Sequence, residues 1–252
     1  MQKGILIEDS LVEMINGKRL KEMEPYPKEI VQTFFPESKK EDYFTANICN
    51  RFSKPDFQVW KGTRAKNVSV KSGKSDSMGF ENIKSFILYL RIKGISEETQ
   101  KTILYYHYGD GTMTGSGKRR WTYEQVSSLL LPRIQKANVE LNTKEMINCA
   151  LDRFVFKGSS GRVISADFVL FGGSKFGSLY SQEEIRLAAT HKHYSYSRAL
   201  HFGPLLIQPY LRDVRGKSGN QSKRETLQAK WHYMQSDLEQ SIEKSNRDAP
   251  VQ

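Results

Sequence analysis

Two short segments with alternating side chains, followed by one amphipathic segment, constrain the fold of this chain most. Residues 56–60 (DFQVW) and 67–71 (NVSVK) have the two-residue period of half-buried β-strands, and Lys61-Gly62-Thr63 supplies a turn between them. Residues 80–93 instead place apolar side chains at the i, i+3, i+4, i+7 spacing of a helix, which Gly94 ends. This order predicts an α/β protein with a small mixed β-sheet flanked by helices.

The remaining segments predict further helices and few strands. Ser10 and Glu13 form a capping-box pattern, so the first helix is expected to begin at Ser10 and to end at Gly17. No segment has the composition of an interdomain linker, so we expect residues 1–252 to form a single domain. Other helices are expected over 28–35, 40–51, 96–106, 122–137, 144–153, 181–190 and 223–243, a strand over 163–170 and extended chain over 200–211.

The charge of the chain is strongly positive and unevenly distributed. Lys and Arg total 39 against 28 Asp and Glu, a net charge of +11. Residues 51–130 hold 14 basic and 7 acidic side chains, and residues 192–230 hold 8 and 2. Two basic blocks favour a polyanionic partner, most simply nucleic acid, although a solvated surface that serves solubility is the alternative.

Cysteine content and hydropathy exclude several classes of protein. The two cysteines, Cys49 and Cys149, provide neither a disulfide framework nor a CxxC zinc site, and they suit a reducing compartment. No apolar run approaches the roughly 18 residues that a membrane span needs. We therefore expect a cytoplasmic protein without a membrane partner.

The predicted strand pair carries the side chains best suited to chemistry. If residues 56–60 and 67–71 form a hairpin, Asp56 lies beside Ser69 and Lys71 on its polar face. A carboxylate can anchor Mg²⁺, and a lysine can orient or deprotonate a water molecule and offset developing negative charge. These groups suit the metal-assisted hydrolysis of a phosphodiester.

At these residues the chain resembles the PD-(D/E)xK nuclease superfamily, which includes many restriction endonucleases and archaeal-type Holliday junction resolvases. Pro55-Asp56 matches the PD pair and Lys71 the final lysine, but Ser69 stands where the family has Asp or Glu. One branch of restriction endonucleases also has Ser-x-Lys and carries the missing acid on the following helix, where Glu81 is expected here. The resemblance implies a restriction-endonuclease-like core over residues 4–93.

A second motif contains another acidic residue that could bind the metal ion. Gly4-x-x-x-Glu8 resembles the G-x-x-x-E of resolvase-like members, in which the glutamate joins the metal site. Glu8 is expected just outside the helix that Ser10 caps. The resemblance thus implies a Mg²⁺ site made by Asp56 with Glu81 or Glu8, with Ser69 alongside and Lys71 as the group that activates water. Alternatively, Glu81 is an acid in the first turn of its helix, where the helix dipole favours a negative charge, and Glu8 is a charged surface residue.

Two basic segments are candidates for contacting DNA. Lys118, Arg119 and Arg120 precede Trp121 in a glycine-rich loop and suit phosphate contacts, with a solvated charge cluster as the alternative. The second segment combines basic side chains with Asn and Gln, which can form hydrogen bonds with the edges of DNA bases. The alternative interpretation is that this segment is a charged, exposed end of a helix. Its basic candidates are Arg212, Arg215, Lys217, Lys223, Arg224 and Lys230.

We therefore expect a Mg²⁺-dependent DNA endonuclease of the type II restriction class. Residues 1–110 would form the catalytic core, and residues 111–252 would complete the sheet and bind double-stranded DNA. Cutting both strands of a symmetric site would require a homodimer. Two alternatives remain: a structure-selective nuclease such as a junction resolvase, which Gly4 and Glu8 favour, and a non-catalytic nucleic-acid-binding protein on a decayed nuclease fold, which Ser69 favours.

Overall fold

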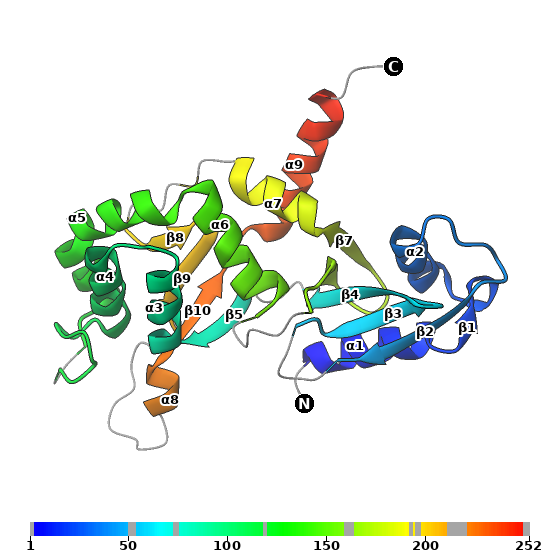
Figure 1. Ribbon diagram of the computed structural model, residues 1–252, viewed down its shortest axis with the longest axis horizontal. Helices are drawn as coiled ribbons and strands as arrows, with labels where there is room; N and C mark the ends of the chain where they lie inside the picture. Colours follow the sequence, from blue (N-terminus) through cyan, green and yellow to red (C-terminus); the bar gives the residue numbers. More distant parts are fainter. Residues whose placement is uncertain are drawn as a thin grey trace. The chain divides into compact units, whose positions relative to one another are not determined.

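The computed structural model describes most of the chain, which divides into two compact units (Figure 1). The first unit contains residues 1–75, 155–187 and 238–252, and the second contains residues 76–154 and 188–237. Each unit therefore draws on segments from both sides of residue 110. The described residues are 3–49, 54–72, 76–117, 120–158, 164–191, 194, 198–210 and 221–248.

The first unit is built on a six-stranded mixed sheet with the strand order β1-β2-β3-β4-β6-β7. Neighbouring strands are antiparallel except β4 and β6, which run parallel. Its strands are β1 (Lys18–Arg19), β2 (Tyr43–Ile48), β3 (Phe57–Lys61), β4 (Arg64–Lys71), β6 (Phe168–Gly172) and β7 (Gly177–Ser181). Its helical segments are α1 (Lys3–Ile15), η1 (Leu20–Glu22), α2 (Pro25–Phe34), the first part of α7 (Gln182–His191) and residues 238–248 of α9 (Met234–Asp248).

A continuous apolar core fixes α1 and α2 to this sheet. Leu11 and Ile15, one turn apart on α1, are fully buried together with Phe44, Phe57 and other side chains of β2, β3 and β4. Helix α1 contacts these three strands, and Figure 1 shows it running along them. The core thus holds α1 in a fixed position on the strands that carry the PD and Ser-x-Lys segments.

The second unit is built on a four-stranded antiparallel sheet with the order β5-β10-β9-β8. Helices α3, α4, α5 and α6 pack on one another and against its strands. The strands are β5 (Ser77–Asn82), β8 (Leu200–Phe202), β9 (Leu205–Pro209) and β10 (Thr226–Lys230). The helices are α3 (Ile83–Ile92), α4 (Glu97–Tyr108), α5 (Tyr123–Leu141), α6 (Lys144–Leu151) and α8 (Gln221–Arg224); the π-helical η2 (Asp152–Phe156) begins in this unit.

The expected α/β class, with a mixed sheet and flanking helices, is confirmed, and helices α4, α5 and α7 form close to the ranges expected for them. Ser96 caps α4, Thr122 forms a capping box with Gln125 at α5, and Ser181 exchanges hydrogen bonds with Glu184 at the start of α7. Each cap satisfies backbone amides that have no partner within the helix. Local side-chain chemistry therefore sets these boundaries.

Besides the first helix, which begins earlier than expected, three expected helices are wrong in whole or in part. The helix expected over 40–51 is strand β2, whose side chains alternate between exposed and buried. Residues 226–230, expected within a helix, form β10, because pairing with both β5 and β9 overrides their helical propensity. The helix expected over 80–93 begins only at Ile83, after β5, where the Asn82 side chain accepts a hydrogen bond from the Lys84 amide.

None of the described helices is long and apolar enough to cross a membrane.

A buried histidine in the second unit makes stability depend on pH. His107 is buried near the end of α4, with Nε2 2.9 Å from the Arg224 carbonyl oxygen, and burial lowers its pKa from 6.5 to about 4. The unfolded chain therefore binds a proton near pH 6.5 that the folded chain binds only near pH 4. The stability contributed by this histidine is full above pH 6.5 and is lost as the pH falls toward 4.

We predict that the free energy of unfolding falls by up to about 3 kcal/mol over this pH range and that His107→Gln removes this dependence, since glutamine does not titrate. Urea unfolding at several pH values between 4 and 7 measures both quantities. Parallel pH profiles for the parent and the variant would contradict the assignment.

Candidate active site

The side chain of Asp56 is held in one orientation at the start of β3. Its backbone amide donates to the Val68 carbonyl oxygen at 2.8 Å, which continues the antiparallel register of β3 and β4 and places Asp56 opposite Ser69. Its Oδ2 atom accepts hydrogen bonds from Ser69 Oγ at 2.9 Å and from the Val70 amide at 2.6 Å. Both bonds end on Oδ2, so the carboxylate is oriented by β4.

The hydroxyl of Ser69 acts as a donor to Asp56. Ser69 is fully buried on β4, between its register partner Val169 on β6 and the β3 side of the sheet. At the position where the family pattern has an acid, this chain therefore has a group that orients the neighbouring carboxylate. A serine hydroxyl is a weak metal ligand, so this contact gives Ser69 a positioning role.

Lys71 is the next residue of β4 on the same side of the strand, and it is half-buried. Burial lowers the pKa of its ammonium group, whereas the negative charges of Asp56 and Glu8 raise it. Lys71 thus lies within electrostatic range of two carboxylates from two other elements. The sequence-based expectation that Asp56, Ser69 and Lys71 would lie together agrees with this geometry.

Glu8 lies inside a helix and not before one. Helix α1 begins at Lys3, so the expectation that Ser10 caps its start is wrong. Glu8 precedes the fully buried Leu11 by three residues, so both lie on neighbouring positions of one helix face. Because α1 is fixed on β2, β3 and β4, Glu8 is held near the end of β4, where its charge acts on Lys71.

A second lysine joins this group, and sequence reasoning missed it. The side chain of Lys54 hydrogen-bonds with that of Lys71, and its pKa lies well below its usual range because of burial and then because of the neighbouring positive charge of Lys71. A neutral amine can accept a hydrogen bond from an ammonium group. The signal in the sequence was the position of Lys54 directly before the Pro55-Asp56 pair.

Glu81 belongs to the second unit, where its carboxylate is bound by an arginine side chain. It lies on β5, in a strand and not at the helix start expected for it. Both of its carboxylate oxygens accept hydrogen bonds from the Arg153 guanidinium; the Glu81 side chain is buried and that of Arg153 is partly exposed. The Arg153 guanidinium also lies 4.0 Å from the centre of the Tyr89 ring. These contacts give Glu81 a structural role in holding β5 to the segment that follows α6.

The acidic groups near Lys71 suit a hard divalent cation. Within the described part of the chain, no three His, Cys, Asp or Glu side chains form a metal-binding group. Glu8 and Asp56 supply two carboxylates. Mg²⁺ is commonly bound by one or two carboxylates and keeps several water molecules, so this donor set fits Mg²⁺.

The residues expected to contact DNA fall into several groups. Lys118, Arg119, Arg212, Arg215 and Lys217 lie outside the described residues. Arg224 forms an ion pair with the buried Asp110 at 2.9 Å, and Lys230 forms one with Asp76 at 3.2 Å. Lys223 is exposed, and Arg120 donates to the His107 carbonyl oxygen.

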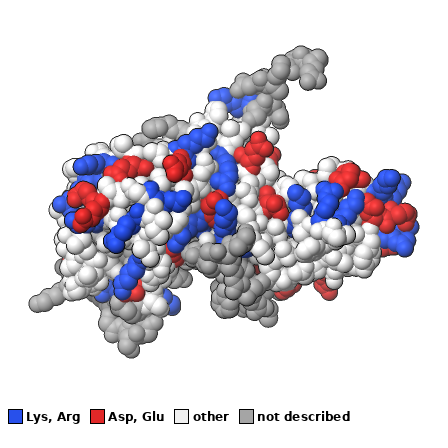
Figure 2. All heavy atoms as spheres, in the orientation of Figure 1, with Lys and Arg blue, Asp and Glu red and all other residues white. Residues whose placement is uncertain are grey.

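The basic side chains are not gathered into one band on the face that Figure 2 shows. Acidic side chains lie among them in both units. In the first unit Lys61 pairs with Asp42 at 2.7 Å, and Arg64 pairs with Glu37. Part of the positive charge of the described residues is therefore compensated locally.

Comparisons with protein-family models, with curated proteins and with solved structures gave no match to this chain.

The contact between Ser69 and Asp56 predicts the effect of two substitutions. Ser69→Ala should lower the free energy of unfolding by about 1 kcal/mol, because Asp56 loses one of its two donors. Ser69→Glu should be more damaging by several kcal/mol, because a second carboxylate would be buried beside Asp56. Urea unfolding measures both changes, with Ser222→Ala, at an exposed serine, as the control. A stable Ser69→Glu protein would show that Ser69 faces a cation or solvent.

Proposed function

We propose that the protein is a metal-dependent DNA endonuclease whose active site is the group formed by Glu8, Asp56 and Lys71. The observation that carries the proposal is their convergence. Helix α1, the residue before β3 and the end of β4 each contribute one of these side chains, and the charges of Glu8 and Asp56 each act on Lys71. They are also the residues on which the resemblance to PD-(D/E)xK nucleases depends.

Glu8 and Asp56 would hold the metal ion. When bound, Mg²⁺ would polarise the scissile phosphate and lower the pKa of a water molecule. Ser69 and the Val70 amide keep the Asp56 carboxylate oriented, so little conformational entropy would be lost when this carboxylate binds a metal ion. Glu8 replaces the acid that is missing at Ser69, and Glu81 has no part in the proposed site.

Lys71 would orient the attacking water molecule and offset the negative charge that develops on the phosphate. Its position on β4, which is paired on both sides, limits its movement. Lys54 adds a second amine beside it. Fixed charged groups of this kind stabilise a transition state because they need not reorganise during the reaction.

Double-stranded DNA is the proposed substrate, because the net charge of +11 favours a polyanion. We propose a type II restriction activity, in which two copies of the chain would cut the two strands of a symmetric site. A structure-selective nuclease is the second candidate. Glu8 favours it, since the G-x-x-x-E pattern is typical of resolvase-like members and Glu8 acts on Lys71.

Removing the proposed catalytic groups should abolish cleavage and preserve DNA binding. Asp56→Ala removes a metal ligand, and Lys71→Ala should slow cleavage by at least about a hundredfold, the usual scale for losing such a group. Lys66→Ala, on the same strand, is the matched control. Cleavage of phage DNA with Mg²⁺ is followed on gels and binding is followed by mobility shift; full activity in Asp56→Ala would contradict the proposed site.

The products of the parent protein separate the candidate functions in the same assay. Discrete fragments from phage DNA support a restriction endonuclease. Cutting confined to branched substrates, regardless of sequence, supports the structure-selective candidate. DNA that is bound and left intact, with every divalent metal tried, would support a non-catalytic binding protein and would contradict the proposed function.

Substitution of the two candidate glutamates should give opposite results. Glu8→Ala should abolish cleavage with little effect on stability, because Glu8 is not part of the apolar core. Glu81→Ala should leave cleavage by the folded protein intact but lower the free energy of unfolding by about 3–5 kcal/mol, since Arg153 loses its buried partner. Glu13→Ala, at an exposed position of α1, is the control for Glu8. Cleavage that survives Glu8→Ala and fails in folded Glu81→Ala would reverse the assignment.

A further inference from the structure

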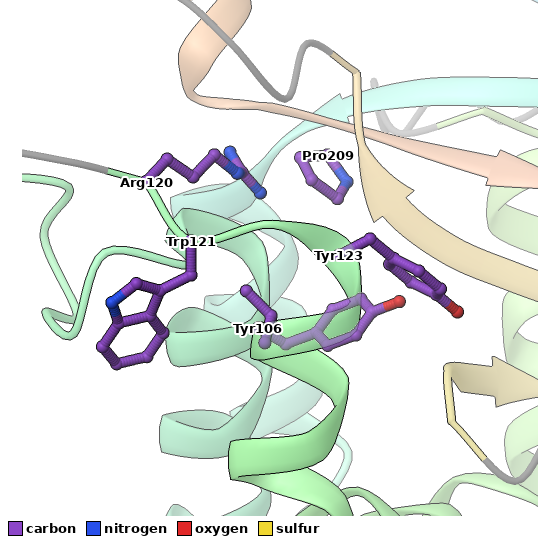
Figure 3. A pocket seen from close by; sticks show the side chains of 6 residues that line it. Tyr106, Arg120, Trp121, Tyr123 and Pro209 are labelled. Carbon is purple, nitrogen blue, oxygen red and sulfur yellow. The ribbon is translucent and has the colours of Figure 1, made fainter.

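A small pocket in the second unit is lined by three aromatic side chains and three other residues (Figure 3). We call it the aromatic pocket, and about 260 Å³ of empty space lies within it and at its open mouth. Because this volume includes space open to solvent, the pocket itself is small. Its walls come from the last turns of α4, the segment that leads into α5, the first residues of α5 and the end of β9. The lining residues are Tyr106, Arg120, Trp121, Tyr123, Val126 and Pro209.

The walls combine flat aromatic surfaces with one cation. Figure 3 shows the rings of Tyr106 and Tyr123 lying together, with Arg120 and Pro209 across from them and Trp121 at one end. Tyr106 is buried, whereas Trp121 and Tyr123 are half-exposed. Such surfaces favour a planar ligand, because aromatic faces and a guanidinium plane both stack on flat π systems.

The cation of the pocket is held in place by the backbone. Arg120 Nη2 donates to the His107 carbonyl oxygen at 2.5 Å, at the end of α4. The amide of the next residue, Trp121, donates to the Gly109 carbonyl oxygen at 2.7 Å. The segment 120–121 is therefore held by two hydrogen bonds to the end of α4 and its C-terminal cap.

A buried carboxylate holds the glycine-rich loop beside the pocket. Asp110 Oδ1 accepts from the amide and hydroxyl of Thr112, and Oδ2 accepts from the Gly117 amide and from Arg224. Trp121 lies against Gly111, whose φ of +79° suits glycine, and a side chain at that position would crowd the indole ring. The loop thus forms a rigid support for Trp121.

We propose that the aromatic pocket binds a single unstacked nucleobase of the nucleic acid that the protein acts on. This inference rests on the proposed function for the class of its ligand. Aromatic side chains and arginine are the groups on which unstacked bases stack, and they do so with little dependence on sequence. A paired base within a duplex is stacked on its neighbours and cannot enter. The pocket therefore requires a base that is unpaired or displaced from the helix.

The test compares the affinity of the protein for a duplex with one unpaired nucleotide and for the same duplex from which the base of that nucleotide is missing. The full-length Asp56→Ala protein is titrated, without divalent metal, with a fluorescent duplex that has one unpaired nucleotide and with the same duplex abasic at that nucleotide. Fluorescence anisotropy gives the two dissociation constants. We expect the duplex that carries the base to bind at least about fivefold more tightly, the lower end of what one base–aromatic stack contributes.

Substitutions in the aromatic pocket test whether its side chains cause the preference for the duplex that carries the base. Trp121→Ala and Tyr123→Ala should each remove most of this preference, and Trp121→Phe, which keeps a ring against Gly111, should retain part of it. Tyr233→Ala is the matched control, because Tyr233 is an aromatic side chain of the same unit that is 68% exposed. Urea unfolding midpoints show which variants are folded at the assay temperature, and only those are compared.

Equal affinity for the two duplexes, or a preference that survives both alanine substitutions, would overturn the proposal. These outcomes are separable from a failure of the proposed function. A protein that cuts DNA with Mg²⁺ but shows no preference for the base contradicts the pocket assignment alone. A protein that shows the preference and cuts nothing supports the pocket and contradicts the nuclease.

Discussion

The candidate site depends on the two hydrogen bonds that fix the Asp56 carboxylate. Ser69 Oγ and the Val70 amide both donate to one oxygen, so the orientation of the carboxylate follows from the pairing of β3 with β4. The same pairing places Lys71 on the strand end beside it. A shift of this register by one residue would turn Ser69 and Lys71 to the other face of the sheet and would separate all three groups.

The core of the first unit positions the remaining acid. Glu8 has no sequence neighbour in the site and reaches it because α1 is packed on β2, β3 and β4 through Leu11 and Ile15. In the proposed site, this arrangement would explain how the chain can have Ser69 where the PD-(D/E)xK motif has an acid. A carboxylate from the helix would supply the second negative charge, and the serine at the strand position orients the first.

Much of this site could be predicted from the sequence, because the strand pair is local and its period of two is strong. The position of Glu8 inside a helix could not be predicted, because the capping-box pattern at Ser10 predicted a helix start after Glu8, whereas α1 begins at Lys3. Glu81 was expected beside Asp56 and Lys71 because it follows Lys71 by ten residues. It lies instead in the second unit, where β5 pairs with β10 and Arg153 binds its carboxylate. Strands β2 and β10 were missed for the same reason: pairing with distant segments overrides local propensity.

The central claim is that Glu8 and Asp56 form one divalent-metal site, and direct measurement of metal binding tests it without any nucleic acid. Isothermal titration calorimetry with Mn²⁺ as a probe should show one site in the parent protein. Its affinity should fall at least about tenfold in both Glu8→Ala and Asp56→Ala, since each removes one of two carboxylate ligands, and should be unchanged in Glu81→Ala. Equal binding by the parent and the first two variants, or loss of binding in folded Glu81→Ala, would contradict the account.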